Sequence, residues 1–125
     1  MAKILIVDDA SFMRGSLKFI TENAGHNVVG TAEDGREALK LYRKLKPDLV
    51  TLDILMQGTD GLSALKTIMK EDPGARVIMV TALGHEEKQE EARMLGASGY
   101  IRKPFKQTEI VDEIKRVLGK DKDDE

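Results

Sequence analysis

Cysteine and tryptophan are absent from this chain of 125 residues, and aromatic residues make up only 4% of it. The lack of cysteine excludes disulfide bonds, thiol nucleophiles and thiolate zinc sites. It is compatible with a reducing cytoplasm, where we expect the protein to reside. Because aromatic residues are scarce, the 41% of hydrophobic residues must build an aliphatic core.

Long hydrophobic runs and an excess of one charge are also missing. No apolar stretch approaches the ~20 residues that cross a bilayer, and the four-residue run after Lys3 is too short for a signal peptide. The 20 basic and 22 acidic residues give a net charge of -2, so the composition does not demand nucleic acid as a partner. We therefore expect one domain that contacts neither a membrane nor nucleic acid directly.

Short apolar runs alternate along the chain with amphipathic stretches. The runs predict five strands at Lys3–Val7, Asn27–Ala32, Asp48–Leu52, Arg76–Thr81 and Ser98–Arg102. The amphipathic stretches predict five helices at Ser11–Ala24, Gly35–Leu45, Gly61–Glu71, Glu86–Leu95 and Thr108–Leu118. This alternation predicts an α/β fold, a doubly wound five-stranded parallel sheet with helices on both faces.

Glycine positions agree with these helix ends. Gly25, Gly96 and Gly119 each follow a helical stretch, where a left-handed residue often terminates a helix. Only charged residues come after Gly119. We therefore predict a folded domain over residues 1–119 and a charged, disordered tail over residues 120–125.

Acidic residues stand where two predicted strands end. The first strand runs into Asp8-Asp9, and the third runs into Asp53. In the flavodoxin-like strand order 2-1-3-4-5, these strands are neighbours at the switch point where such sheets bind ligands. Crowded carboxylates repel one another unless they share a cation or a proton. Oxygen ligands suit Mg²⁺, so the sharpest interpretation is a metal-assisted carboxylate that accepts a phosphoryl group.

Two more polar groups are expected at the same edge. Thr81 ends the fourth strand, and Lys103 follows the fifth. A hydroxyl and an ammonium can stabilise the charge that gathers on phosphoryl oxygens during transfer. Each residue alone has a simpler interpretation. Asp8 is equally well explained as the N-cap of the next helix, and Thr81 or Lys103 as an ordinary strand or surface residue.

The order of these groups resembles the receiver domain of bacterial two-component response regulators. The resemblance spans residues 2–119. It is carried by Val7-Asp8-Asp9, Leu52-Asp53, Asp60-Gly61, Val80-Thr81-Ala82, Gly96-Ala97 and Lys103-Pro104-Phe105. It implies a CheY-like fold and a phosphorelay signalling module, not an enzyme with a substrate of its own. Within the family, residues 7–14 look most like chemotaxis regulators of the CheY type.

The resemblance also implies a role for each acidic residue. Asp53 would accept the phosphoryl group from a sensor histidine kinase or a phosphotransfer protein. Asp9 would bind Mg²⁺ directly, and Asp8 would hold a metal-bound water. Asp53 and the backbone carbonyl of Leu55 would complete the protein ligands.

The remaining family positions imply a switch. Thr81 would donate its hydroxyl to a phosphoryl oxygen, and Lys103 would pair first with Asp53 and then with the phosphate. The Lys103-Pro104 bond looks like the cis peptide of the family. Tyr100 would act as a rotamer switch, although a half-buried strand residue explains it equally well. The fourth helix, fifth strand and fifth helix would form the face that binds a downstream target.

One position departs from the family, and three alternatives stay open. Gln57 follows Met56 where the family usually has proline, which frees the backbone and puts the stiffness of this loop in doubt.

The first alternative function is a Mg²⁺-dependent phosphatase with an aspartate nucleophile. Such an enzyme usually has a second Asp two residues after the nucleophile, where this chain has Leu55. A flavodoxin-like cofactor carrier would need a hydroxyl- and glycine-rich loop after the first strand. The third alternative is a receiver fragment of a larger regulator.

Overall fold

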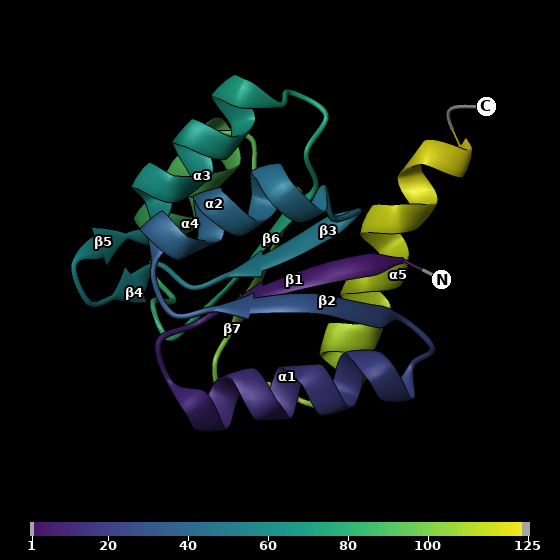
Figure 1. Ribbon diagram of the computed structural model, residues 1–125. Coiled ribbons are helices and arrows are strands. Elements are labelled where there is room, and N and C mark those ends of the chain that lie inside the picture. Colours follow the sequence, from purple (N-terminus) through teal and green to yellow (C-terminus); the bar gives the residue numbers. More distant parts are fainter. Residues whose placement is uncertain (1, 124–125) are drawn as a thin grey trace.

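The computed structural model describes residues 2–123 and the side chains of residues 2–119. Five parallel strands form one sheet: β1 (Lys3–Val7), β2 (Asn27–Ala32), β3 (Leu49–Leu52), β6 (Val77–Thr81) and β7 (Gly99–Arg102). The helices are α1 (Ser11–Asn23), α2 (Gly35–Leu45), α3 (Gly61–Glu71), α4 (Glu86–Met94) and α5 (Gln107–Asp123). The spatial order β2-β1-β3-β6-β7 confirms the predicted order 2-1-3-4-5 (Figure 1).

The side chains of the sheet alternate between two hydrophobic cores, one on each face. In β1, Leu5 and Val7 join the core beneath α2, α3 and α4, whereas Ile4 and Ile6 join the core beneath α1 and α5. Figure 1 shows α1 on one side of the sheet and α2 with α3 on the other. Burial on both faces explains why the parallel strands have nearly continuous apolar sequences.

The ends of the predicted helices were mostly right, with one exception. Gly25 and Gly96 have φ angles of 95° and 105°, which confirms them as left-handed residues after α1 and α4. Gly119 was wrongly predicted to end the last helix, because α5 continues to Asp123. Glycine permits a left-handed backbone but does not require one, and within a helix it costs only about 1 kcal/mol relative to alanine.

The predicted tail therefore begins as helix. The backbone at 120–123 belongs to α5, and residues 124–125 lie outside the described part of the chain. The division between domain and tail stays a prediction.

Within residues 2–123, no helix has both the length and the hydrophobicity needed to cross a bilayer.

A short antiparallel hairpin has no counterpart among the predicted elements. It consists of β4 (Leu55–Met56) and β5 (Thr59–Asp60), joined by a two-residue turn. Gly58 in this turn has a φ angle of 75°, a conformation that glycine adopts readily. The hairpin directly follows the end of β3, so it forms one wall of the carboxyl edge of the sheet.

Candidate functional site

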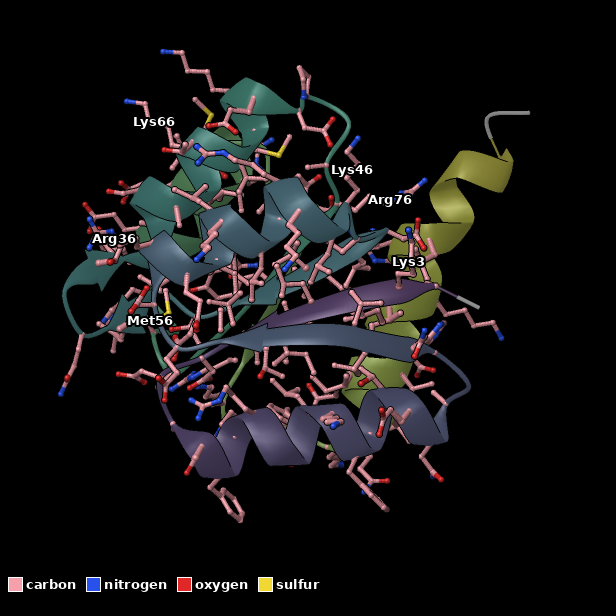
Figure 2. The ribbon with its side chains drawn as sticks, viewed as in Figure 1. Lys3, Arg36, Lys46, Met56, Lys66 and Arg76 are labelled. Carbon is pink, nitrogen blue, oxygen red and sulfur yellow. The ribbon has the colours of Figure 1, made fainter. Side chains whose placement is uncertain are left out.

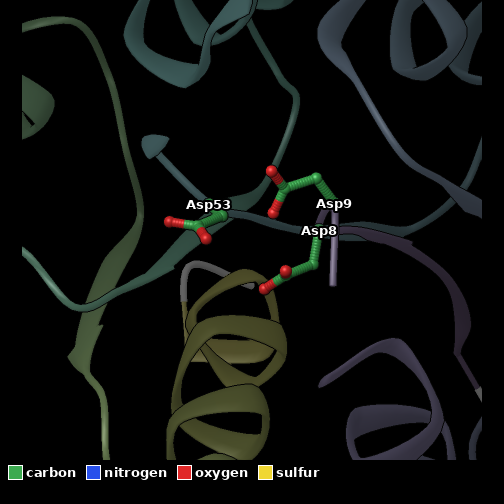
Figure 3. A group of neighbouring side chains, drawn as sticks. All are labelled: Asp8, Asp9 and Asp53. Atoms are coloured by element: carbon green, nitrogen blue, oxygen red, sulfur yellow. The ribbon is translucent and has the colours of Figure 1, made fainter. Parts of the chain in front are cut away.

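Three carboxylates meet at the carboxyl edge of the sheet, as the strand ends predict. Val7 of β1 and Leu52 of β3 are opposite one another in neighbouring parallel strands. The residues that follow them, Asp8, Asp9 and Asp53, therefore emerge side by side (Figure 3). One oxygen from each carboxylate lies within 4.8 Å of the others.

Burial differs among these three residues. Asp8 is 1% exposed and Asp53 is 5% exposed, whereas Asp9 lies at the surface. Two buried carboxylates so close together need positive charge or hydrogen bonds to offset their repulsion and their lost hydration. The surroundings of Asp8 and Asp53 supply both.

Lys103 bridges the two buried carboxylates. Its Nζ lies 2.6 Å from Oδ2 of Asp8 and 2.9 Å from Oδ2 of Asp53. Burial acts to lower the pKa of Lys103, but the hydrogen bonds to both carboxylates and their negative charges outweigh it and raise that pKa above its ordinary value. Lys103 is therefore a permanent cation at neutral pH. Its pairing with Asp53 agrees with the prediction, and its pairing with Asp8 is an addition to it.

Backbone amides provide the hydrogen bonds. The Leu55 N–H donates to Oδ1 of Asp53 at 3.2 Å, and the Ala10 N–H donates to Oδ1 of Asp8 at 3.0 Å. Ala10 is itself the N-cap of α1, so the interpretation of Asp8 as that cap is wrong. Arg14 adds a contact that the sequence does not reveal, because its Nη1 donates to the Asp8 carbonyl at 2.8 Å.

Thr81 and Tyr100 contact the same loop residue. The fully buried Thr81 accepts a hydrogen bond at its Oγ1 from the Leu83 N–H at 3.3 Å, and the Tyr100 hydroxyl donates to the Leu83 carbonyl. Burial raises the pKa of Tyr100, and the negative charge of Asp53 raises it further. Tyr100 is half-buried, as its interpretation as an ordinary strand residue predicts. In addition, both Tyr100 and Thr81 hydrogen-bond to the backbone of Leu83.

The chain around the site also fits the predicted geometry. The Lys103-Pro104 peptide is cis, which confirms that prediction. The Lys103 N–H donates to the Thr81 carbonyl at 2.8 Å, which ties the end of β7 to the end of β6. On the other side of the site, a Cβ on Gly61 would collide with the backbone carbonyl of Asp53. Only glycine at 61 allows α3 to begin so close to the third carboxylate.

The donor set suits Mg²⁺. Carboxylate oxygens are hard ligands, and the three that meet here carry more negative charge than the one ammonium of Lys103 can neutralise. A divalent cation would correct that imbalance. The Leu55 backbone, which the predicted ligand set includes, belongs to the adjoining hairpin.

Residues 4–115 match the family model of the response regulator receiver domain. The chain belongs to this family. The receiver is 46% identical over 115 residues to the chemotaxis protein CheY of Thermotoga maritima, an alignment that covers 92% of this chain and 96% of that protein. It is 45% identical over 119 residues to the protein CcdB of Bacillus subtilis, covering 95% of this chain and 99% of that protein.

A solved structure extends the likeness to three dimensions. The receiver resembles a chain in the crystal structure of the CheX-CheY-BeF3-Mg+2 complex from Borrelia burgdorferi, with a TM-score of 0.91 and 38% identity. The match covers 93% of this chain and 88% of that one. The family and the fold that the sequence predicts are thereby confirmed, and the protein is a receiver homologous to CheY.

Proposed function

We propose that this receiver accepts a phosphoryl group on Asp53 from a histidine kinase or a phosphotransfer protein. The arrangement of Asp53 carries the proposal. Its buried carboxylate ends β3, contacts the Lys103 ammonium at 2.9 Å and lies beside the carboxylates of Asp8 and Asp9. A structural ion pair would need neither the third carboxylate nor its position at a topological switch point.

The reaction follows from these groups. An oxygen of Asp53 attacks the phosphorus in line, a P–O bond forms, and the P–N bond to the donor histidine breaks with its electron pair going to the imidazole. Lys103 lies where it can neutralise the charge on the phosphoryl oxygens. Asp9, Asp53 and the Leu55 carbonyl would hold Mg²⁺ directly, and Asp8 would hold it through a water. The ion would add positive charge at the same phosphoryl oxygens.

A shared loop residue supports the proposed switch. If the Thr81 hydroxyl turns toward a phosphoryl oxygen, the Leu83 N–H loses its acceptor. The Leu83 carbonyl is in turn the acceptor for the Tyr100 hydroxyl, so movement of Leu83 releases the tyrosine ring. The adjoining helix α4 buries only Ala92, so little packing restrains it from moving with the loop.

The output surface is the face formed by α4, β7 and α5. A hollow of about 230 Å³ lies there, lined by residues that include Ala92, Tyr100 and Arg116. Two arginines at its rim are already paired. Arg93 pairs with Glu90, and Arg116 pairs with Glu113 of α5. The hollow borders Tyr100, so a change in that ring changes the surface that a target would meet.

The similarity to proteins called CheY supports a role in chemotaxis signalling in the cytoplasm. In that role the chain promotes its own phosphorylation and dephosphorylation and turns over no other substrate. The net charge of -2 gives no electrostatic reason to expect nucleic acid as a direct partner.

Incubation with acetyl phosphate and Mg²⁺ tests the function. We expect one covalent phosphoryl group per chain and slow release of phosphate that matches its decay. Asp53→Asn should abolish labelling, whereas Asp112→Asn, which changes an exposed aspartate of α5, should not. Rapid release of phosphate without accumulation of the adduct would identify a phosphatase, and the absence of both the adduct and phosphate release would contradict a phosphorelay receiver.

A further inference from the structure

The hairpin that carries the proposed metal ligand Leu55 is packed against the first turn of α2. Figure 1 shows β4 and β5 beside the start of α2, and Figure 2 places Met56 of the hairpin and Arg36 of α2 at the same end of the molecule. The contact is made by Thr59 of β5 and Gly35 of α2. A Cβ built on Gly35 would lie 3.1 Å from the Cβ of Thr59 and nearer still to its γ-methyl group.

Gly35 is required here for space. Its φ angle is not among the positive ones, so the backbone itself would accept any residue. The missing side chain leaves room for the Thr59 methyl group, and the Cβ of Ala64 in α3 closes the same space at 3.3 Å from the position of a Gly35 Cβ. Thr59 is therefore wedged against Gly35 at the start of α2.

The wedge is connected to the acceptor through the hairpin. Thr59 pairs with Met56, and the next pair joins Asp60 to Leu55. The Leu55 N–H donates to Oδ1 of Asp53 at 3.2 Å. Because two adjacent pairs of a short hairpin and one hydrogen bond join Thr59 to the acceptor, a displacement of Thr59 should displace the Leu55 backbone and its hydrogen bond to the Asp53 carboxylate.

We propose that Gly35 and Thr59 are positioning residues, which fix the hairpin so that the Leu55 carbonyl and the Asp53 carboxylate face a common Mg²⁺. Gln57 does not fix the φ angle of this turn as a proline would. Packing of Thr59 on Gly35 supplies the restraint in its place. The inference rests on the proposed function, since it concerns the metal that phosphoryl transfer would use.

The experiment is a double-mutant cycle read out by Mg²⁺ affinity, measured by titration of backbone amide resonances. Gly35→Ala should push Thr59 away and weaken Mg²⁺ binding roughly tenfold, the lower range for lost support of metal ligands. It should also shift the amide resonances of Leu55 and Asp53 before any metal is added. Thr59→Ala in the same chain removes the closest methyl group and should recover most of the affinity.

Gly15→Ala is the matched control. Gly15 lies in α1 with no heavy atom near the position of an added Cβ, so this change should leave Mg²⁺ affinity unaltered. Wild-type affinity in Gly35→Ala, or a loss that Thr59→Ala does not relieve, would overturn the proposal. If Gly35→Ala does not fold, Thr59→Ala alone decides, because it creates no collision. It should speed amide exchange in the hairpin and weaken Mg²⁺ binding, and unchanged values of both would refute the inference.

The outcome is separable from that of the proposed function. An unphosphorylated Asp53 in the wild-type chain would end the proposed function, yet the Mg²⁺ cycle would still show whether Thr59 positions the hairpin. Conversely, normal phosphorylation with no coupling between Gly35 and Thr59 would reject only the positioning role.

Discussion

Replacing Lys103 with methionine removes the ammonium that holds two buried carboxylates together. Methionine has a similar length and keeps the apolar packing of the stem, so the main loss is charge. The side chain of Asp8 is 1% exposed and that of Asp53 is 7% exposed. Neither carboxylate can therefore recover its hydration without movement of the surrounding chain.

The expected loss is large for a domain of this size. Removing one partner of a buried ion pair costs about 3–5 kcal/mol, because it leaves an uncompensated charge. Domains of this kind have free energies of unfolding of about 5–15 kcal/mol. Urea denaturation at neutral pH without metal should therefore show a midpoint far below that of the wild type. Mg²⁺ should restore part of the loss, since it binds the same carboxylates in the folded state only.

Two further measurements make this prediction specific. Lys66→Met, a change at an exposed position of α3, should alter the free energy of unfolding by less than about 0.5 kcal/mol. The effect of Lys103→Met also depends on pH. The folded-state pKa of Lys103 is raised above its ordinary 10.5, so its stabilisation is complete below pH 10.5 and is lost as pH rises through the folded-state pKa. The difference in the free energy of unfolding between wild type and Lys103→Met should therefore become smaller as pH rises through that folded-state pKa. A loss below about 1 kcal/mol at neutral pH would refute the bridging role of Lys103.

Three other predictions concern metal, lifetime and switching. Asp9→Asn should weaken the stabilisation by Mg²⁺ in thermal unfolding and raise metal-free stability by relieving repulsion; no response to Mg²⁺ in the wild type would contradict the metal site. Leu55 and Leu83 line one hollow at the hairpin that follows Asp53, so Leu55→Asn and Leu83→Gln should speed loss of the phosphoryl group by admitting and orienting water, and unchanged decay in both would mean that these side chains do not obstruct it. Beryllofluoride with Mg²⁺ should shift amide resonances around Tyr100 and α4, except in Thr81→Ala, and shifts confined to the metal loop would argue against a switch.

The parts of the fold that could be predicted are those with a strong local pattern. β1 and β2 match their predicted ranges to the residue, and β1 is buried on both faces, so its apolar run is unbroken. The carboxylate cluster could be predicted equally well, because Asp8 and Asp53 directly follow strands that become neighbours in a doubly wound sheet. Topology alone brings those side chains to one edge.

The remaining contacts depend on geometry that no short segment encodes. The hydrogen bond from Lys103 to Asp8 joins residues 95 positions apart and requires the Lys103 side chain to reach from the end of β7 to the end of β1. The hairpin β4–β5 has two residues in each strand, too few to show a period, and Gly58 is its only local sign. The wedge of Thr59 against Gly35 depends on how closely α2 and the hairpin approach.

The measurement that tests the account most directly is the mapping of the phosphorylated residue. After incubation with acetyl phosphate and Mg²⁺, borohydride reduces an acyl phosphate of aspartate to homoserine, which mass spectrometry locates within a proteolytic peptide. The account predicts homoserine at position 53 and at no other aspartate, with the modification absent when Mg²⁺ is withheld. Homoserine at Asp8 or Asp9, or an unmodified Asp53 in a chain that carries phosphate, would contradict it.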